Sequence, residues 1–318
     1  MVISNSLLEK LLQKDKRSIA RSISIVESDN AESSELLKAI YYKVGNAYRI
    51  GITGPPGAGK STITNQLAKV FLNKQKTVGI IAVDPTSPYT GGALLGDRVR
   101  MNEIGQNPGV FIRSMATRGS LGGLSKTAND AADIIDAAGY DYIIFETVGV
   151  GQSELDIAQA ADSTMVVLVP ESGDSVQAMK AGLMEIADFF VMNKSDRPES
   201  EQAITALKTI LMMKNYEVNS WFPSIIKATA IDNKGIEDIV NEIEKHRKYL
   251  LDSGNFQKRR EKHFHIRIKE IVEDRIKKIL WNSEGQKEII SSLNKLRISD
   301  ISPYNIADEI LDNFRKQL

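Results

Sequence analysis

Eight residues near the start of this 318-residue chain have the types and the spacing that hold a phosphate group. The segment from Gly54 to Ser61 reads GPPGAGKS and fits the phosphate-loop (P-loop) pattern G-x-x-x-x-G-K-[ST]. Its glycines let successive N–H groups face one anion, Lys60 offers a positive charge to the β- and γ-phosphates, and the Ser61 hydroxyl offers a ligand to Mg²⁺. We predict that nucleotide phosphates contact Gly54, Pro55, Pro56, Gly57, Ala58, Gly59, Lys60, Ser61 and Thr62.

A glycine- and proline-rich turn that happens to precede a lysine is the alternative interpretation of this segment. The flanking sequence argues against it, because residues 48–53 have the β-branched character of a buried strand and residues 65–72 have apolar residues at helical spacing. A strand, a glycine-rich loop and a helix in this order are the context that a P-loop requires.

The second chemical signal is the sequence Asn193-Lys194-Ser195-Asp196, directly after the strand-like residues 189–192. The Asp196 carboxylate can accept hydrogen bonds from N1–H and the amino group of guanine, whereas adenine has no N1–H. Asn193 can fix the purine edge and the loop itself, and the Lys194 stem can lie along the base. The pattern therefore favours GTP over ATP. In the later loop at residues 228–230, a backbone N–H can reach guanine O6, with Thr229 and Ala230 as the candidates.

Carboxylates at the ends of two predicted strands are candidates for the metal site. Asp84 ends the run at 79–83, and Glu146 ends the run at 142–145. Asp97 is either a helix cap or a group that reaches the metal or the attacking water, and the sequence leaves both open. The metal candidates are Ser61, Asp84, Asp97 and Glu146, and the catalytic candidates are Lys60, Asp97 and Glu146.

The residues after Glu146 bear on the hydrolysis rate. Gly149 can present its N–H to a γ-phosphate and move when that group leaves. Val150 occupies the place where Ras-like enzymes have a glutamine that orients water. We therefore expect slow hydrolysis unless Asp97, Gln152 or a partner protein supplies the missing group.

Three segments position these residues. Residues 1–46 have the pattern of a helical N-terminal extension, residues 47–253 alternate strands with helices as in a parallel α/β sheet, and residues 254–318 form charged helices without strands. We expect the basic residues along the start of this last segment, Arg259 among them, to lie on a solvated helix face. The apolar stripe that includes Phe264, Ile268 and Val272 needs a partner surface. Further strands are predicted at 77–83, 110–113, 142–145, 164–169, 189–192 and 224–227.

Composition limits the partners and the compartment. The 41 basic and 41 acidic residues balance, which disfavours nucleic acid and anionic lipid as partners. The chain has no cysteine, no apolar run near the ~20 residues that span a bilayer, and no basic-then-apolar signal at its start. We expect a cytoplasmic protein without membrane attachment.

Long stretches of the chain resemble a known family, the MeaB, MMAA and ArgK type of GTPase that serves as a G-protein chaperone of adenosylcobalamin-dependent methylmalonyl-CoA mutase. The resemblance covers most of the chain. Its stretches lie at 54–62, 82–88, 91–101, 113–123, 146–154, 173–174, 180–182, 184–188 and 193–196.

This resemblance implies a SIMIBI-class P-loop GTPase with a helical N-terminal extension and a C-terminal helical arm that makes a homodimer. It implies that GTP hydrolysis is coupled to loading and protection of the mutase, with an adenosyltransferase as a further candidate partner. The segment at 170–180 would be a switch loop, with Gly173, Asp174 and Lys180 as signalling residues; otherwise it is an ordinary glycine-containing loop and helix start. The chain lacks the D-x-H-x-x-G pattern of cobalamin binding, so we expect adenosylcobalamin contact through the mutase alone.

Three other functions compete with this one. A metal-insertion GTPase usually needs His and Cys clusters, and this chain has no cysteine and three histidines, His246, His263 and His265. A kinase for a small molecule or protein would pass the γ-phosphate to an acceptor. A GTP-dependent scaffold would bind nucleotide without turnover, even in the presence of mutase.

Overall fold

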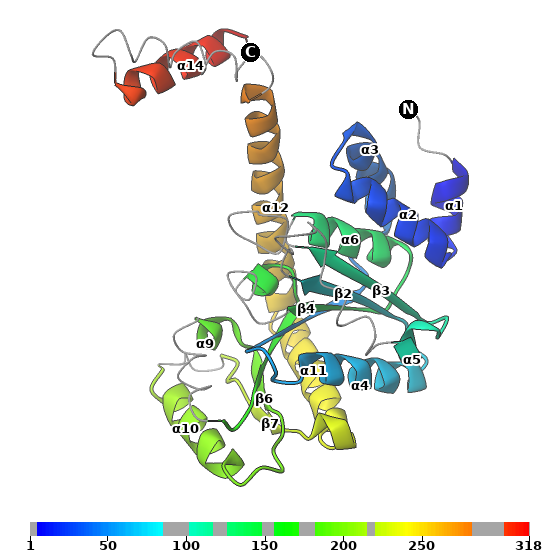
Figure 1. Ribbon diagram of the computed structural model, residues 1–318, viewed down its shortest axis with the longest axis vertical. Helices are drawn as coiled ribbons and strands as arrows, with labels where there is room; N and C mark the ends of the chain where they lie inside the picture. The colour runs from blue at the N-terminus through cyan, green and yellow to red at the C-terminus, as the bar shows by residue number, and fades with distance from the viewer. Residues whose placement is uncertain are drawn as a thin grey trace. The chain divides into compact units, whose positions relative to one another are not determined.

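The computed structural model describes residues 5–84, 102–116, 126–147, 156–171, 182–214, 220–281 and 302–317. The chain divides into two compact units, Met1–Arg259 and Arg260–Leu318. The first unit contains a seven-stranded sheet with flanking helices, and the second contains helices (Figure 1).

All neighbouring strands of the sheet run parallel, in the order β3-β2-β4-β1-β5-β6-β7. This confirms the predicted α/β class with a mostly parallel sheet. Because the strands are parallel, the carboxyl ends of β1, β2, β4, β6 and β7 lie at one edge of the sheet. The strands are β1 (Tyr48–Thr53), β2 (Val78–Asp84), β3 (Val110–Ala116), β4 (Tyr142–Thr147), β5 (Ser163–Leu168), β6 (Phe189–Met192) and β7 (Ile225–Lys227).

Helices cover both faces of the sheet because its strands are apolar on both sides. Ile144 of β4 packs with helices α4 (Lys60–Asn73) and α11 (Ile236–Asp252). Its neighbours Ile143 and Phe145 belong to a second core, formed with α6 (Lys126–Ala137) on the other face. A third core surrounds β6. The other helices that contact the sheet or its loops are α5 (Asn102–Gly105), α9 (Leu183–Ile186), α10 (Ser200–Met212), and the short η3 (Ile157–Gln159) and η4 (Ala230–Asp232).

The predicted N-terminal helices form and pack on α6. They are α1 (Asn5–Leu12), α2 (Lys16–Glu27), α3 (Ala31–Ile40) and the short η1 (Tyr41–Lys43). The Asp136 carboxylate of α6 accepts the N–H groups of Gly45, Asn46 and Ala47 at 2.9–3.1 Å, which fixes the chain as it leaves this extension and enters β1. The extension is therefore attached to the sheet domain by defined contacts.

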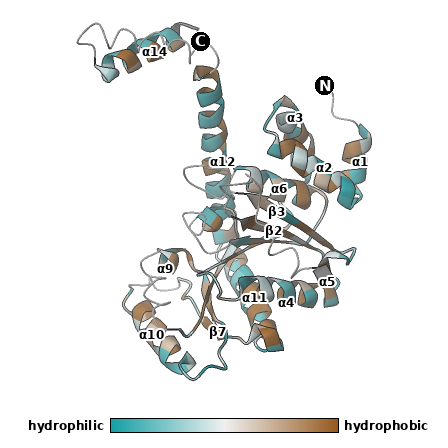
Figure 2. Cartoon of the chain, viewed as in Figure 1, coloured by the Kyte–Doolittle hydropathy of each residue, from teal (hydrophilic) through white to brown (hydrophobic). Residues whose placement is uncertain are grey.

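The C-terminal helices are α12 (Asn255–Leu280) and α14 (Pro303–Gln317). Polar and apolar residues alternate along α12 (Figure 2), and none of its side chains is buried. Phe264, Ile268 and Val272 are each about half exposed. Among the helices that the structure describes, none combines the length and the apolar character that a membrane span requires.

One expectation for α12 was wrong. Arg259 does not lie on a solvated face, because its guanidinium forms an ion pair with the largely buried Asp188, 2.9 Å away. The local sequence around Arg259 is rich in charge, and this long-range partner is not visible in it.

Candidate nucleotide site

The P-loop joins the end of β1 to the start of α4, as the sequence predicts. Gly54 and Gly59 have φ angles of 136° and 90°, which L-residues with a side chain rarely adopt. A Cβ at Gly54 would lie 2.0 Å from the Val167 carbonyl oxygen of β5, and one at Gly59 would lie 2.3 Å from Asn193 Nδ2. These glycines therefore let the loop pack against β5 and against the base loop, Asn193–Asp196.

Lys60, the first residue of α4, turns its ammonium group back over this loop. Its Nζ donates to the carbonyl oxygens of Gly54 at 2.7 Å and Pro55 at 2.9 Å, and the residue is buried. The start of α4 also presents N–H groups and the positive end of the helix dipole. This end of the loop therefore has the charge and the donors that a phosphate chain needs.

Ser61 and Glu146 lie together at the carboxyl edge of the sheet. The Ser61 hydroxyl donates to Glu146 Oε1, and Glu146 is buried near the end of β4. Since the hydroxyl proton points to the carboxylate, the lone pairs of Ser61 Oγ are free to face a cation. A hydroxyl and a carboxylate side by side fit Mg²⁺, which prefers oxygen ligands.

Asp84 ends β2, which pairs with β4 up to Val83 and Thr147. This register brings the backbone of Asp84 to the same edge as Glu146. Among the described residues, no group of three or more His, Cys, Asp or Glu side chains is placed to hold a metal ion. The predictions for Asp97, Gly149, Gly173, Asp174 and Lys180 lie outside the described residues.

Asn193 connects three loops of the site. Its Nδ2 donates to the carbonyl oxygen of Ala58 in the P-loop at 2.8 Å, and its Oδ1 accepts the N–H of Ala230 at 3.1 Å. The side chain thus has the predicted role of fixing the loop. The Ala230 N–H, expected to face guanine O6, donates to Asn193 in this structure.

Asp196 lies beside the loop at residues 228–230, here called the second base loop. Thr229 Oγ1 donates to Asp196 Oδ1 at 3.3 Å, and the Ser195 N–H donates to the Ala228 carbonyl oxygen at 3.0 Å. Lys194 has a φ of 55°, a backbone conformation that marks a tight turn. The structure therefore brings the two sequence-distant halves of the predicted guanine site together.

Two supporting residues were not found by the sequence reasoning. Gln66 of α4 donates from Nε2 to the Ala230 carbonyl oxygen at 3.3 Å, so the helix after the P-loop also holds the second base loop. Glu171 pairs with Arg197 and lies 3.8 Å from Lys194 Nζ. The helical spacing of α4 identifies its apolar face, but it gives no signal for the partner of Gln66.

Comparison with known proteins agrees with this geometry. Residues 19–285 match the family model "Methylmalonyl Co-A mutase-associated GTPase MeaB". The chain belongs to the MeaB family. It is 46% identical to a Pyrococcus abyssi protein whose name describes it as a GTPase, over 96% of this chain and 95% of that protein. It is 35% identical to the Escherichia coli GTPase ArgK, over 93% and 92% of the two chains.

Two further relatives extend the comparison. The mitochondrial methylmalonic aciduria type A homolog of Caenorhabditis elegans is 32% identical, over 93% of this chain and 76% of that protein. A solved structure titled as a LAO/AO transport system kinase has a TM-score of 0.73 at 26% identity and covers 99% of this chain and 100% of its own. The suspected family is confirmed, and this MeaB-family chain is a P-loop GTPase that hydrolyses GTP.

Proposed function

We propose that this MeaB-family GTPase binds an adenosylcobalamin-dependent acyl-CoA mutase, with methylmalonyl-CoA mutase as the first candidate. GTP hydrolysis would be coupled to loading of the mutase cofactor and to its protection. The observation that supports the nucleotide part is that Asn193 is hydrogen-bonded to the P-loop at 2.8 Å and to the Ala230 loop at 3.1 Å, so the candidate phosphate and guanine loops are adjacent. The mutase part is supported by the family and by its relatives.

Each residue at the sheet edge has a defined task in this proposal. Lys60 and the P-loop N–H groups bind the β- and γ-phosphates, and Asp196 accepts from the guanine edge. Ser61 and Glu146, with Asp84 and Asp97, would hold Mg²⁺, which supplies charge neutralisation on the phosphates. Since Val150 has no group that orients water, hydrolysis by the isolated protein is expected to be slow, and Asp97, Gln152 or the mutase would complete the site.

The signalling and assembly residues follow from the same proposal. Gly173, Asp174 and Lys180 would report the state of the nucleotide to the mutase, and an adenosyltransferase would be a second partner. The half-exposed apolar stripe of α12 would pair two copies of the chain. Adenosylcobalamin would be contacted through the mutase, and the complex would work in the cytoplasm.

The deciding experiment mixes the purified protein with candidate acyl-CoA mutases in Mg²⁺ and GTP. Complex formation is followed by size-exclusion chromatography and GTP turnover by phosphate release. A mutase that co-elutes with the GTPase and raises its turnover supports the proposal. Normal GTP turnover with no complex for any mutase would contradict the chaperone function and leave the GTPase assignment intact.

The kinase alternative is separated by the fate of the γ-phosphate. With γ-labelled GTP, the proposal expects the label in inorganic phosphate, whereas a kinase would place it on an acceptor molecule. The metal-insertion alternative is disfavoured by His246, which is buried between Ser163 and Asp188 rather than placed to bind a cargo metal.

A further inference from the structure

The two strands that carry the guanine loops are the shortest of the seven strands described. Strand β6 has four residues and ends at the base loop, Asn193–Asp196, and β7 has three residues and leads to Ala230. Strand β7 lies at the edge of the sheet, and none of its residues is fully buried. Such short strands gain little support from their own ladders, so their position depends on what holds their other ends.

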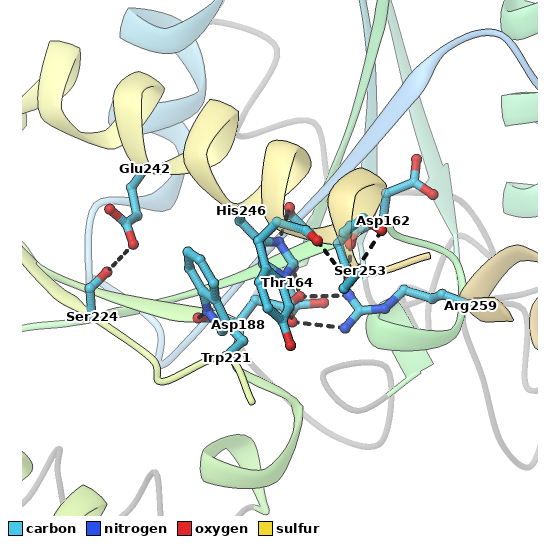
Figure 3. Close-up of polar contacts among 12 residues, drawn as sticks. Asp162, Thr164, Asp188, Trp221, Ser224, Glu242, His246, Ser253 and Arg259 are labelled. Carbon is cyan, nitrogen blue, oxygen red and sulfur yellow. Dashed lines mark hydrogen bonds and ion pairs between the residues drawn. The ribbon is translucent and has the colours of Figure 1, made fainter. Parts of the chain in front are cut away.

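Asp188, directly before β6, is held by four groups (Figure 3). Arg259 of α12 donates from both terminal nitrogens to its two carboxylate oxygens, each at 2.9 Å. The Thr164 N–H donates to Oδ2 at 2.7 Å, and His246 Nε2 lies 3.3 Å from Oδ1. The Trp221 indole N–H donates to the Asp188 carbonyl oxygen at 2.6 Å. Both the side chain and the backbone of Asp188 are therefore fixed.

The electrostatics of this pair favour a permanent contact. Burial alone would lower the pKa of Arg259, but the hydrogen bonds and the charge of Asp188 outweigh it, so the pKa lies above its ordinary value. A third hydrogen bond, from Arg259 to the Asp162 carbonyl oxygen at 2.6 Å, joins the guanidinium to the residue before β5. Two-point binding of a planar guanidinium fixes direction as well as distance.

The residue directly before β7, Ser224, is held by helix α11. Ser224 Oγ donates to Glu242 Oε1 at 2.7 Å (Figure 3). The Ser224 carbonyl oxygen accepts the Phe190 N–H of β6 at 2.8 Å. Glu242 and His246 lie four residues apart on α11, so they share one helix face. Helices α11 and α12 thus hold the amino ends of both strands whose carboxyl ends carry the guanine loops.

The hydrogen-bonded series Ser163, His246 and Asp188 resembles the catalytic triad of a hydrolase, but its burial excludes that chemistry. Ser163 is 0% exposed and His246 is 1% exposed, and the Ser163 hydroxyl is also hydrogen-bonded to the Tyr48 hydroxyl at 2.6 Å. A carbonyl substrate could not reach Ser163 Oγ. The cluster therefore has a structural role, which is to fix the amino ends of the strands that it contacts. Any influence on the nucleotide site must be transmitted along those strands.

We propose that Asp188 and Arg259 are positioning residues for guanine recognition, acting through β6 on the base loop. Asp188 and Asn193 lie at the two ends of β6, about 17 Å apart at ~3.3 Å per residue. An extended strand cannot lengthen, so the anchor at Asp188 sets how far Asn193 and Asp196 reach along the strand direction. Hydrogen bonds weaken with small errors of distance and angle, so Asp196 can read guanine only where β6 is held in place. This inference rests on the proposed guanine nucleotide site.

The test compares GDP with inosine diphosphate, which lacks the 2-amino group that Asp196 would bind. Dissociation constants of both nucleotides in Mg²⁺ are measured by calorimetry for the full-length wild type, Arg259→Gln, Arg259→Lys and the control Lys258→Gln, a change at an exposed neighbour on α12. We expect Arg259→Gln to weaken GDP binding about tenfold and to lower the inosine-to-guanine ratio of dissociation constants at least about threefold. Arg259→Lys should recover part of the ratio, and Lys258→Gln should match the wild type.

The ratio separates positioning from simple loss of folded protein. A smaller folded fraction lowers the measured stoichiometry for both nucleotides and leaves the ratio unchanged. A folded Arg259→Gln protein with the wild-type ratio overturns the proposal. If that variant does not fold, Arg259→Lys decides in the same way, because it keeps the charge and loses the two-point geometry. Wild-type protein that binds neither nucleotide would instead contradict the proposed function itself.

Discussion

Asn193 makes the phosphate loop and the guanine loop into one unit, because each end of its amide bonds a different loop. Recognition of guanosine phosphates then needs a cation at one end of the pocket and a carboxylate at the other. Lys60 and Asp196 supply these charges, and Lys60 also donates to the P-loop carbonyl oxygens of Gly54 and Pro55. Both are therefore suitable for direct tests.

Lys60→Ala is expected to lower GTP binding or turnover by roughly 10- to 100-fold, since a hydrogen bond to a charged group contributes about 1.5–3 kcal/mol. The loss should concern nucleotides that carry β- and γ-phosphates, while guanosine itself should not distinguish the variant from the wild type. Phosphate release and calorimetry measure both effects. Wild-type turnover in this variant would show that the phosphate site lies elsewhere.

Asp196→Asn is expected to weaken GTP by about 10- to 100-fold and to favour xanthosine triphosphate. The new amide can accept from N1–H of xanthine and donate to its C2 carbonyl, whereas it faces the guanine amino group with a donor. Competition between the two nucleotides measures the switch. Asn193→Ala is not a suitable control because it breaks the P-loop contact at Ala58. Ser195→Ala is the matched control, because it changes an uncharged residue of the same loop. An unchanged preference for GTP would reject Asp196 as the base contact.

At the scale of elements, the buried polar cluster of Ser163, Asp188 and His246, which joins β5, β6 and α11, depends on a neutral His246. A neutral His246 that carries its proton on Nε2 can donate to Asp188, 3.3 Å away. Its Nδ1 can then accept from the Ser163 hydroxyl, 2.6 Å away, and that hydroxyl can accept from the Tyr48 hydroxyl. Burial lowers the pKa of His246, although three carboxylates oppose this effect. The charged and polar groups that act on it or contact it are Asp188, Asp162, Glu242, Arg259, Ser163, Trp221 and Tyr249.

This shift predicts a pH dependence of stability with a definite sign. The unfolded chain keeps a histidine pKa of about 6.5, so below that pH it binds a proton that the folded state refuses. The free energy of unfolding should therefore fall as the pH is lowered from 7 toward the folded pKa, by at most ~1.4 kcal/mol per pH unit for one proton. Urea unfolding of the wild type and His246→Gln between pH 7.5 and 5.5 checks this. Equal slopes for the two proteins would show that another group is responsible.

The sequence predicted the elements that depend on local signals and missed those that depend on distant ones. The strands that lead to Asp84 and Glu146 and the helix after the P-loop follow from short apolar runs and a glycine-rich loop, although β4 extends one residue beyond Glu146 and α4 begins before the predicted run at 65–72. The Arg259–Asp188 pair joins residues 71 positions apart, and nothing in the charged stretch around Arg259 distinguishes it from its solvated neighbours. Gln66 was missed for the same reason, since its partner loop lies 164 residues away.

At the scale of the whole molecule, the C-terminal arm carries apolar surface that its own chain leaves exposed. Phe264, Ile268, Val272, Ile276 and Ile279 recur at helical spacing on α12, and each is 45–54% exposed. A stripe of this kind is costly in water and is typical of a helix that pairs with another helix. If this stripe pairs two copies of the chain, replacing its apolar side chains with polar ones should dissociate the dimer.

The double substitution Ile268→Ser and Val272→Ser should raise the dimer dissociation constant at least about tenfold, since each side chain contributes ~1.5–3 kcal/mol when fully buried. Lys269→Ser lies between them on α12 and is 73% exposed as a side chain, so it serves as the matched control. Sedimentation velocity over a range of concentrations gives the dissociation constant, and GDP affinity measured on the same samples shows that the GTPase domain is intact. A double variant that remains a dimer with the wild-type constant would assign the pairing surface to another part of the molecule, whereas a wild type that is monomeric at all concentrations would leave the stripe to the mutase.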